Sequence, residues 1–248
     1  VSQIAKKHQF DSFYKREIKM WNENKLKDRV DFRIFILYNR LVYKGKSMNE
    51  LSGKEILSGI SIAGILKAYT VFDNTLMKEF LKKYPVKLVF DPFAGWGERM
   101  FTCCLYGVKY QGIDIRAELK AGYDAMIADY GLINASFNVC DAEVFDDYEA
   151  DSIITCPPYH NAEVYSELGL ENKSLEEFKI AITKIFKRAS KKGVKYVALQ
   201  SNQKCKELFI SALSSAGFTH IESIDGDVKK SHLCKNKTEY ETLLIFKR

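Results

Sequence analysis

The feature that most constrains the fold of this chain is the alternation, from residue 85 onward, of short apolar runs with longer amphipathic segments. The apolar runs have the length of β-strands, and the segments between them have the spacing of a helix face. The predicted strands span residues 87–93, 109–115, 134–140, 151–155, 194–200, 220–224 and 242–246. The predicted helices span residues 98–106, 117–130, 174–191 and 203–216.

Strands that are separated by helices form a doubly wound parallel sheet with right-handed crossovers. Only a loop separates the last two predicted strands, so we expect an antiparallel pair at one edge. The chain is therefore predicted to be an α/β protein with a seven-stranded sheet. Ligands of such sheets bind beyond the carboxyl ends of the strands, where the strand order reverses.

Residues 1–70 differ from the rest of the chain in their hydrophobic pattern and in their charge. They are predicted to be mostly helical, since Phe10, Tyr14, Ile18 and Trp21 share one helix face. Residues 1–84 contain 17 Lys and Arg against 9 Asp and Glu, whereas residues 85–248 contain 21 against 23. A basic flank predicts a polyanionic partner, although a solvated helical surface has the same composition. We expect a basic accessory or recognition segment at residues 1–70 and a main domain at residues 71–248.

The composition argues against several classes of protein. No apolar run reaches the ~20 residues of a membrane-spanning helix, and the first residues lack the apolar core of a signal peptide. The six cysteines include no CxxC pair, so neither a zinc site nor a disulfide framework is predicted. We expect no membrane association, no metal, and a reducing cytoplasm, either of a bacterium or of the host of a phage.

Three short motifs follow the first three predicted strands. Asp91-Pro-Phe-Ala-Gly-Trp-Gly97 provides a glycine turn before a helix, which allows close approach of a ligand carboxylate to free backbone amides. Asp114, in Gly112-Ile-Asp-Ile115, lies 17 residues after the last of these glycines, near the spacing at which an acid binds ribose hydroxyls. The alternative role of Asp114 is to serve as the N-cap of the following predicted helix. Asp141 ends the third strand and is placed to accept a hydrogen bond from an adenine amine.

The fourth motif, Thr155-Cys-Pro-Pro-Tyr159, ends the short predicted strand Asp-Ser-Ile-Ile-Thr at residues 151–155, which has an apolar centre. Two consecutive prolines fix an extended turn and remove two amide donors, so the turn presents carbonyl acceptors. The adjacent tyrosine offers a flat surface on which a base can stack. A rigid turn that only caps a core strand is the alternative.

Together, DPFAGWG, GIDI, a third-strand Asp and CPPY resemble the S-adenosylmethionine-dependent DNA amino-methyltransferases, which make N6-methyladenine or N4-methylcytosine. The resemblance covers residues 71–248 and implies a Rossmann-like class I methyltransferase fold. It implies that Asp91, Phe93, Gly95 and Gly97 contact the methionine part of S-adenosylmethionine, Asp114 the ribose, and Asp141 with Ala142 the adenine. The remaining cofactor-binding candidates lie in the same motifs and are Pro92, Ala94, Ile115 and Thr155. The catalytic candidates are Cys156, Pro157, Pro158 and Tyr159.

One residue departs from the pattern of that family, which has Asp, Asn or Ser where this chain has Cys156. Thiol sulfur is a weak hydrogen-bond acceptor. We therefore expect the carbonyl of Pro157 to provide more of the polarisation of the target amine, together with positioning beside the methyl donor. The resembling family has Ser at this position more often in its N4-cytosine enzymes, and Cys resembles Ser in size, so N4-cytosine is slightly favoured over N6-adenine.

The target is expected to be a base in nucleic acid, DNA in preference to RNA, that is flipped out or already unpaired. Candidate substrate contacts are Asn161 and Tyr165, which follow the Cys-Pro-Pro-Tyr turn, with simple loop packing as the alternative. Lys229 and Lys230 belong to a lysine cluster between the last two predicted strands, which would either hold the phosphate backbone or form a solvated hairpin tip. Neither the glycine motif nor the Cys-Pro-Pro-Tyr motif is followed by the long insertion that is expected of a sequence-reading domain. Target recognition is therefore expected to lie in the N-terminal helices or in an additional domain or subunit, as in restriction-modification.

Four other functions share these motifs. RNA base amines and a protein glutamine amide are methylated by related proteins, although Cys156 disfavours the amide. Cytosine C5 methylation would use Cys156 as a nucleophile, but that chemistry normally has Pro before the Cys, and here it follows. A nucleic-acid-binding module that has kept the fold and lost activity is the fourth.

Overall fold

The computed structural model describes residues 72, 74–160, 169–226, 229–230, 238–239 and 241–248. The chain divides into two compact units, residues 10–70 and residues 1–9 together with 71–248, and every described residue belongs to the second unit. The helices predicted within residues 1–70 lie outside the described residues. Within these described ranges, no helix is long and apolar enough to cross a membrane.

The unit is built on a seven-stranded sheet with the order β3-β2-β1-β4-β5-β9-β6. Its strands are β1 (Leu88–Asp91), β2 (Lys109–Asp114), β3 (Ala135–Val139), β4 (Ser152–Thr155), β5 (Tyr196–Ser201), β6 (Thr219–Asp225) and β9 (Thr242–Lys247). The first five are parallel, and β9 is antiparallel to both β5 and β6. The prediction of an α/β fold with seven strands and an antiparallel edge is confirmed. Strands β7 (Lys229–Lys230) and β8 (Thr238–Glu239) form a separate short hairpin.

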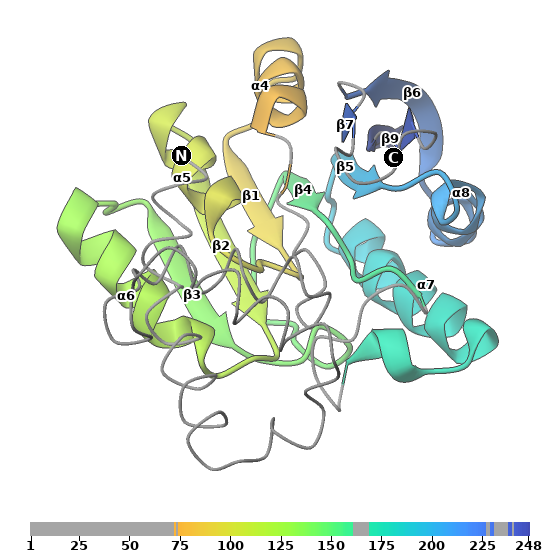
Figure 1. The fold of residues 1–248 in the computed structure, drawn as a ribbon, viewed down its shortest axis with the longest axis horizontal. Coiled ribbons are helices and arrows are strands. Elements are labelled where there is room, and N and C mark those ends of the chain that lie inside the picture. Colours follow the sequence, from red (N-terminus) through yellow and green to blue (C-terminus); the bar gives the residue numbers. More distant parts are fainter. Residues whose placement is uncertain (1–71, 73, 161–168, 227–228, 231–237, 240) are drawn as a thin grey trace, which may run out of the picture. The chain divides into compact units, whose positions relative to one another are not determined.

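Helices cover both faces of the sheet (Figure 1). They are α4 (Asn74–Lys83), α5 (Glu98–Leu105), α6 (Leu119–Tyr130), α7 (Leu175–Lys191) and α8 (Lys206–Ser215), with a 3-10 turn at Leu170–Asn172. Helices α4, α5 and α6 share one core cluster, and α7 and α8 share the other. The four helices predicted after residue 97 are confirmed, with ends shifted by three residues or fewer.

The alternation of side chains along each strand explains the two cores. In β4, Ile153 packs in the cluster with α7 and α8, and Ile154 packs in the cluster with α4, α5 and α6. All four residues of β4 are buried, as expected for a central strand that is covered on both faces. Helix α7 begins with a capping box, in which Ser174 and Glu177 satisfy each other's backbone amides.

The strand order determines where a ligand site can form. Chain crossovers lead from β1 to β2 and β3 on one side, and from β4 to β5 on the other, so the order reverses between the adjacent strands β1 and β4. The carboxyl ends of these two strands are therefore the expected ligand-binding edge. Because β9 is antiparallel to β5, its first residue rather than its last lies at this edge, where Ser201 pairs with Thr242.

Candidate active site

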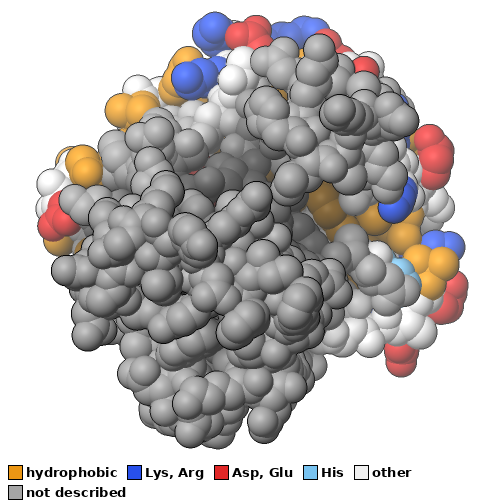
Figure 2. All heavy atoms as spheres, viewed as in Figure 1, with side chains coloured by type: hydrophobic (Ala, Val, Ile, Leu, Met, Phe, Trp, Pro, Cys, Tyr) orange, Lys and Arg blue, Asp and Glu red, His pale blue; other side chains and the backbone are white. Residues whose placement is uncertain are grey.

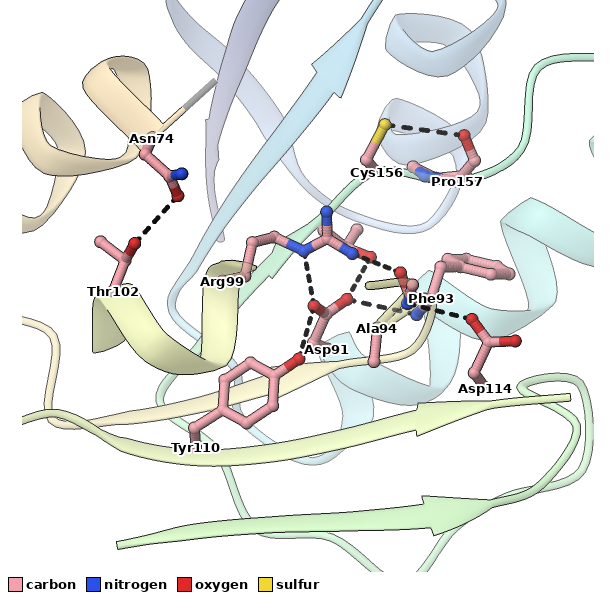
Figure 3. Close-up of polar contacts among 12 residues, drawn as sticks. Asn74, Asp91, Phe93, Ala94, Arg99, Thr102, Tyr110, Asp114, Cys156 and Pro157 are labelled. Atoms are coloured by element: carbon pink, nitrogen blue, oxygen red, sulfur yellow. Dashed lines mark hydrogen bonds and ion pairs between the residues drawn. The ribbon is translucent and has the colours of Figure 1, made fainter. Parts of the chain in front are cut away.

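A buried carboxylate joins the elements that meet at the switch point. Asp91 ends β1, has no exposed surface, and accepts four hydrogen bonds. One oxygen accepts from the Thr155 hydroxyl at 2.7 Å and the backbone amide of Phe93 at 3.2 Å. The other accepts from Arg99 Nε at 2.6 Å and the Tyr110 hydroxyl at 2.8 Å. Asp91 therefore connects β1 to β2, β4 and α5 (Figure 3).

Arg99 supplies the countercharge for this carboxylate from the first turn of α5. Its side chain is 5% exposed, and its guanidinium also donates to the carbonyl of Phe93. The guanidinium carbon lies 4.9 Å from the centre of the Phe72 ring. Burial alone would lower the pKa of Arg99, but the adjacent Asp91 carboxylate raises it above its ordinary value. Arg99 therefore stays charged, and the buried pair is electrically balanced.

Two glycines permit this packing. Gly97, at φ +96°, is the N-cap of α5, and a Cβ there would lie 2.6 Å from Met126 Cε. Gly112 lies two residues after Tyr110 in β2, and a Cβ there would lie 2.7 Å from the tyrosine hydroxyl oxygen. The glycine of the GIDI motif thus makes room for Tyr110 to reach Asp91.

Asp114 ends β2 beside the glycine turn, where the sequence predicts the ribose-binding acid. One carboxylate oxygen accepts from the Gly95 amide at 3.0 Å, and the other accepts from the backbone amide of Arg116 at 3.1 Å and its Nε at 3.2 Å. The side chain is 11% exposed. A carboxylate has about four acceptor positions, so Asp114 retains capacity for a further donor.

Asp141 follows β3, and its carboxylate accepts from the Glu143 amide at 2.8 Å. Arg188, on α7, fixes the same loop by donating to the carbonyls of Ala142 at 3.1 Å, Phe145 at 2.5 Å and Glu143 at 2.5 Å. Arg188 is not predictable from the sequence, because an arginine in the last turn of a helix is commonplace. Its contacts hold the loop in which the adenine-binding residues are predicted.

The predicted catalytic turn, residues 156–159, follows β4 directly. Cys156 and Pro158 are partly exposed, whereas Pro157 and Tyr159 are buried. The Cys156 sulfur lies 4.0 Å from the Pro157 carbonyl oxygen (Figure 3) and 3.7 Å from the Tyr159 hydroxyl oxygen. The tyrosine side chain belongs to a core cluster and is 3% exposed. Its ring is therefore not an open stacking surface here, and stacking on a base stays a prediction.

A carboxylate that the sequence analysis missed lies next to this turn. Glu241 directly precedes β9 and accepts hydrogen bonds from the Tyr159 hydroxyl and, at 3.2 Å, from Gln200 Nε2. Gln200 is fully buried in β5. Glu241 could have been predicted from the expected antiparallel last strand, because such a strand brings the residue before it to the ligand-binding edge.

The remaining predicted residues have different positions. Pro92, Ala94 and Thr155 are buried, and Thr155 directs its hydroxyl to Asp91 rather than outward. Phe93, Gly95 and Ile115 are partly exposed at the edge. Lys229 and Lys230 form strand β7. Asn161 and Tyr165 lie outside the described residues.

Comparisons with known proteins identify the fold. No protein-family model matches the sequence, and no curated protein matches it. Among solved structures, the N-methyltransferase NodS from Bradyrhizobium japonicum WM9, in complex with S-adenosyl-L-homocysteine, has 13% sequence identity and a TM-score of 0.51. The similarity covers 71% of this chain and 84% of NodS.

Two further structures are much longer than this chain. The tRNA (uracil-54, C5)-methyltransferase from Pyrococcus abyssi, in complex with S-adenosyl-L-homocysteine, has 14% identity and a TM-score of 0.50, covering 69% of this chain and 37% of that chain. TrmN from Thermus thermophilus has 16% identity and a TM-score of 0.48, covering 71% of this chain and 47% of that chain. The chain thus spans less than half of the length of either protein. The similarity to NodS and the Pyrococcus enzyme, with the strand order, shows the Rossmann-like methyltransferase fold.

We expect replacement of Arg99 by Met to destabilise the protein strongly. The Asp91 carboxylate would remain buried without its countercharge, which costs about 3–5 kcal/mol of unfolding free energy. Urea denaturation followed by circular dichroism measures this change. Lys120→Met is the matched control, because Lys120 pairs with Asp124 on the surface of α6 and its loss should cost at most about 1 kcal/mol. Equal losses for the two variants would contradict the role of Arg99.

Proposed function

We propose that this chain is an S-adenosylmethionine-dependent methyltransferase that acts on an exocyclic amine of a base in DNA, either N4 of cytosine or N6 of adenine. One observation carries the proposal. The glycine turn after β1 and the Cys-Pro-Pro-Tyr turn after β4 lie at the strand switch point and are joined by the 2.7 Å hydrogen bond from Thr155 to Asp91. A methyl donor and an amine acceptor bound at these two turns would be neighbours.

The residues at the edge fit S-adenosylmethionine in their chemistry. Asp114 and Asp141 place hydrogen-bond acceptors after consecutive parallel strands, as a ligand with ribose hydroxyls and an adenine amine requires. Phe93, Gly95 and Trp96 are the partly exposed residues of the glycine turn, and of these Phe93 and Gly95 would contact the methionine part. Two structurally similar proteins were solved with S-adenosyl-L-homocysteine, the product that remains after methyl transfer, and this supports the assignment.

The catalytic turn suits an amine that must be made nucleophilic. When bound, S-adenosylmethionine supplies a methyl group on a positively charged sulfur. The carbonyl of Pro157 and the sulfur of Cys156 would accept hydrogen bonds from the N–H groups of the target amine. These bonds would orient the nitrogen lone pair toward that methyl group. Fixing the two reactants in this orientation provides much of the rate enhancement of such a transfer.

The choice of nucleic acid rests on the motifs and on the charge of the N-terminal segment. Figure 2 shows acidic and basic side chains interspersed over the described part of the face in view, in agreement with the near-neutral composition of residues 85–248. The excess of Lys and Arg in residues 1–84 is the feature that favours a polyanion. RNA is the second candidate, supported by the structural similarity to an enzyme that acts on tRNA.

The direct test is mass spectrometry of nucleosides after incubation of DNA and RNA with the protein and S-adenosylmethionine that carries a deuterated methyl group. We expect labelled N4-methyldeoxycytidine or N6-methyldeoxyadenosine. Label found in RNA alone would replace the proposal by the second candidate. Absence of label from both nucleic acids would overturn the proposal.

Replacement of Asp114 by Ala should weaken binding of S-adenosylmethionine by about 10- to 100-fold, because hydrogen bonds between the ribose hydroxyls and a charged carboxylate would be lost. Isothermal titration calorimetry measures the affinity. Asp124→Ala on the exposed side of α6 is the control and should bind normally. An unchanged affinity of the Asp114 variant would remove this residue from the site.

The variant Cys156→Ser separates amine methylation from cytosine C5 methylation. A hydroxyl can replace the thiol as an acceptor, so amine methylation should continue within about tenfold of the unaltered rate. C5 methylation would stop, because its mechanism needs the sulfur as a covalent nucleophile. The rate of label transfer to DNA measures the difference, and complete loss of activity would contradict the amine mechanism.

A further inference from the structure

Glu241 lies at the ligand-binding edge of the sheet but belongs to none of the four motifs. Strand β9 is antiparallel to β5, and Thr242 pairs with Ser201, the last residue of β5. The residue before β9 therefore lies at the same edge as the catalytic turn. Its carboxylate crosses from β9 past β5 to reach Tyr159, which follows β4.

The contacts form a hydrogen-bonded chain that starts at Cys156. The thiol lies 3.7 Å from the Tyr159 oxygen, and the Tyr159 hydroxyl donates to Oε2 of Glu241. Gln200 Nε2 donates to the same carboxylate oxygen at 3.2 Å and so fixes its position. Tyr159 and Gln200 are 3% and 0% exposed, so water competes little for these bonds.

An ionised carboxylate can only accept hydrogen bonds, so Glu241 determines the direction of the whole chain. Tyr159 must donate its single proton to Glu241, and its oxygen can then only accept from the thiol of Cys156. Burial, together with the nearby Cys156 and Glu241, raises the pKa of Tyr159 well above its ordinary value, so the hydroxyl keeps the proton that it donates. Without the carboxylate, the hydroxyl could turn and donate to the sulfur instead.

We propose that Glu241 is a positioning residue that compensates for the weak acceptor Cys156, by orienting the Tyr159 hydroxyl so that the thiol proton points away from the target. The thiol then donates to Tyr159, at 3.7 Å, rather than to the Pro157 carbonyl oxygen, at 4.0 Å, so the proton occupies neither that carbonyl nor the side of the sulfur that faces the substrate. This inference rests on the proposed function and deepens it, because a turn that presents only acceptors selects a neutral N–H donor as its substrate.

Methyl transfer to the amine at this turn needs no reactant besides the methyl donor and water. The amine nitrogen forms a bond to the methyl carbon, while the carbon–sulfur bond of the donor breaks and its electron pair stays on sulfur. The surplus proton leaves the nitrogen for water. Acceptors that hold the N–H bonds favour the tetrahedral nitrogen that forms in this step, whereas a donor pointed at the nitrogen would occupy its lone pair.

The test is a double-mutant cycle between Glu241 and Cys156, with methyl transfer to DNA as the measured rate. Glu241→Gln should lower kcat about tenfold, the change that corresponds to the net contribution of one hydrogen bond, and should leave the affinity for S-adenosylmethionine within about twofold. In the Cys156→Asn background the same replacement should lower kcat less than about twofold, because an amide oxygen is a strong acceptor without help from Tyr159.

Two further variants keep the test decisive. Glu222→Gln is the matched control, because Glu222 accepts a hydrogen bond from the Tyr84 hydroxyl at 2.8 Å, away from the ligand edge, and its loss should not change kcat. Tyr159→Phe removes the hydroxyl that links Cys156 to Glu241 and keeps the ring. It should therefore lower kcat about as much as is expected for Glu241→Gln, and it replaces the Glu241 variant in the test if Glu241→Gln does not fold.

The outcomes separate this inference from the proposed function. Equal losses of kcat in the Cys156 and Cys156→Asn backgrounds would show that Glu241 acts independently of the thiol, and an unchanged kcat would also overturn the inference. Both results would leave the methyltransferase intact. Failure of the unaltered protein to methylate any nucleic acid would overturn the proposed function and this inference with it.

Discussion

The buried pair of Asp91 and Arg99 is the interaction on which the rest of the site depends. A carboxylate without solvent contact must be satisfied within the protein, and Asp91 is satisfied by donors from β2, β4 and α5 at distances of 2.6–2.8 Å. Each of these donors fixes the element that carries it. The end of β1, the start of the glycine turn and the end of β4 are therefore held together by one side chain.

Around this centre, the parallel sheet brings acceptors to one edge. Asp114 and Asp141 follow β2 and β3, which are adjacent in the sheet, and the catalytic turn follows β4 on the other side of β1. The antiparallel β9 adds Glu241 from the opposite chain direction. The edge is consequently rich in carboxylates and carbonyls, which suits the hydroxyl, amine and sulfonium groups of the proposed donor and target. This complementarity links the fold to the chemistry that we propose for it.

The acids at the strand ends were predictable because a strand and the turn after it are determined locally. The glycine turn at Gly97 was predicted from the apolar strand before it, and Asp114 was predicted from its spacing of 17 residues after that glycine. The side chains that contact the residues of the site could not be predicted in this way. Arg188 reaches the loop after β3 from a helix more than 40 residues away, and Arg99 gave no sign in the sequence that it would pair with Asp91. Tyr159 was expected to be open to a base, whereas its ring is packed in the core.

By itself, the sequence determined the seven strands, the helices after residue 97 and the order of the four motifs, because hydrophobic periodicity depends on residues that are close in the chain. It also indicated the residue types that the chemistry requires. Only the tertiary structure decided which side chains meet: that Thr155 faces Asp91, and that Glu241 faces Tyr159. The reason is physical, since a contact between distant residues depends on strand order, strand direction and the space left by neighbouring side chains.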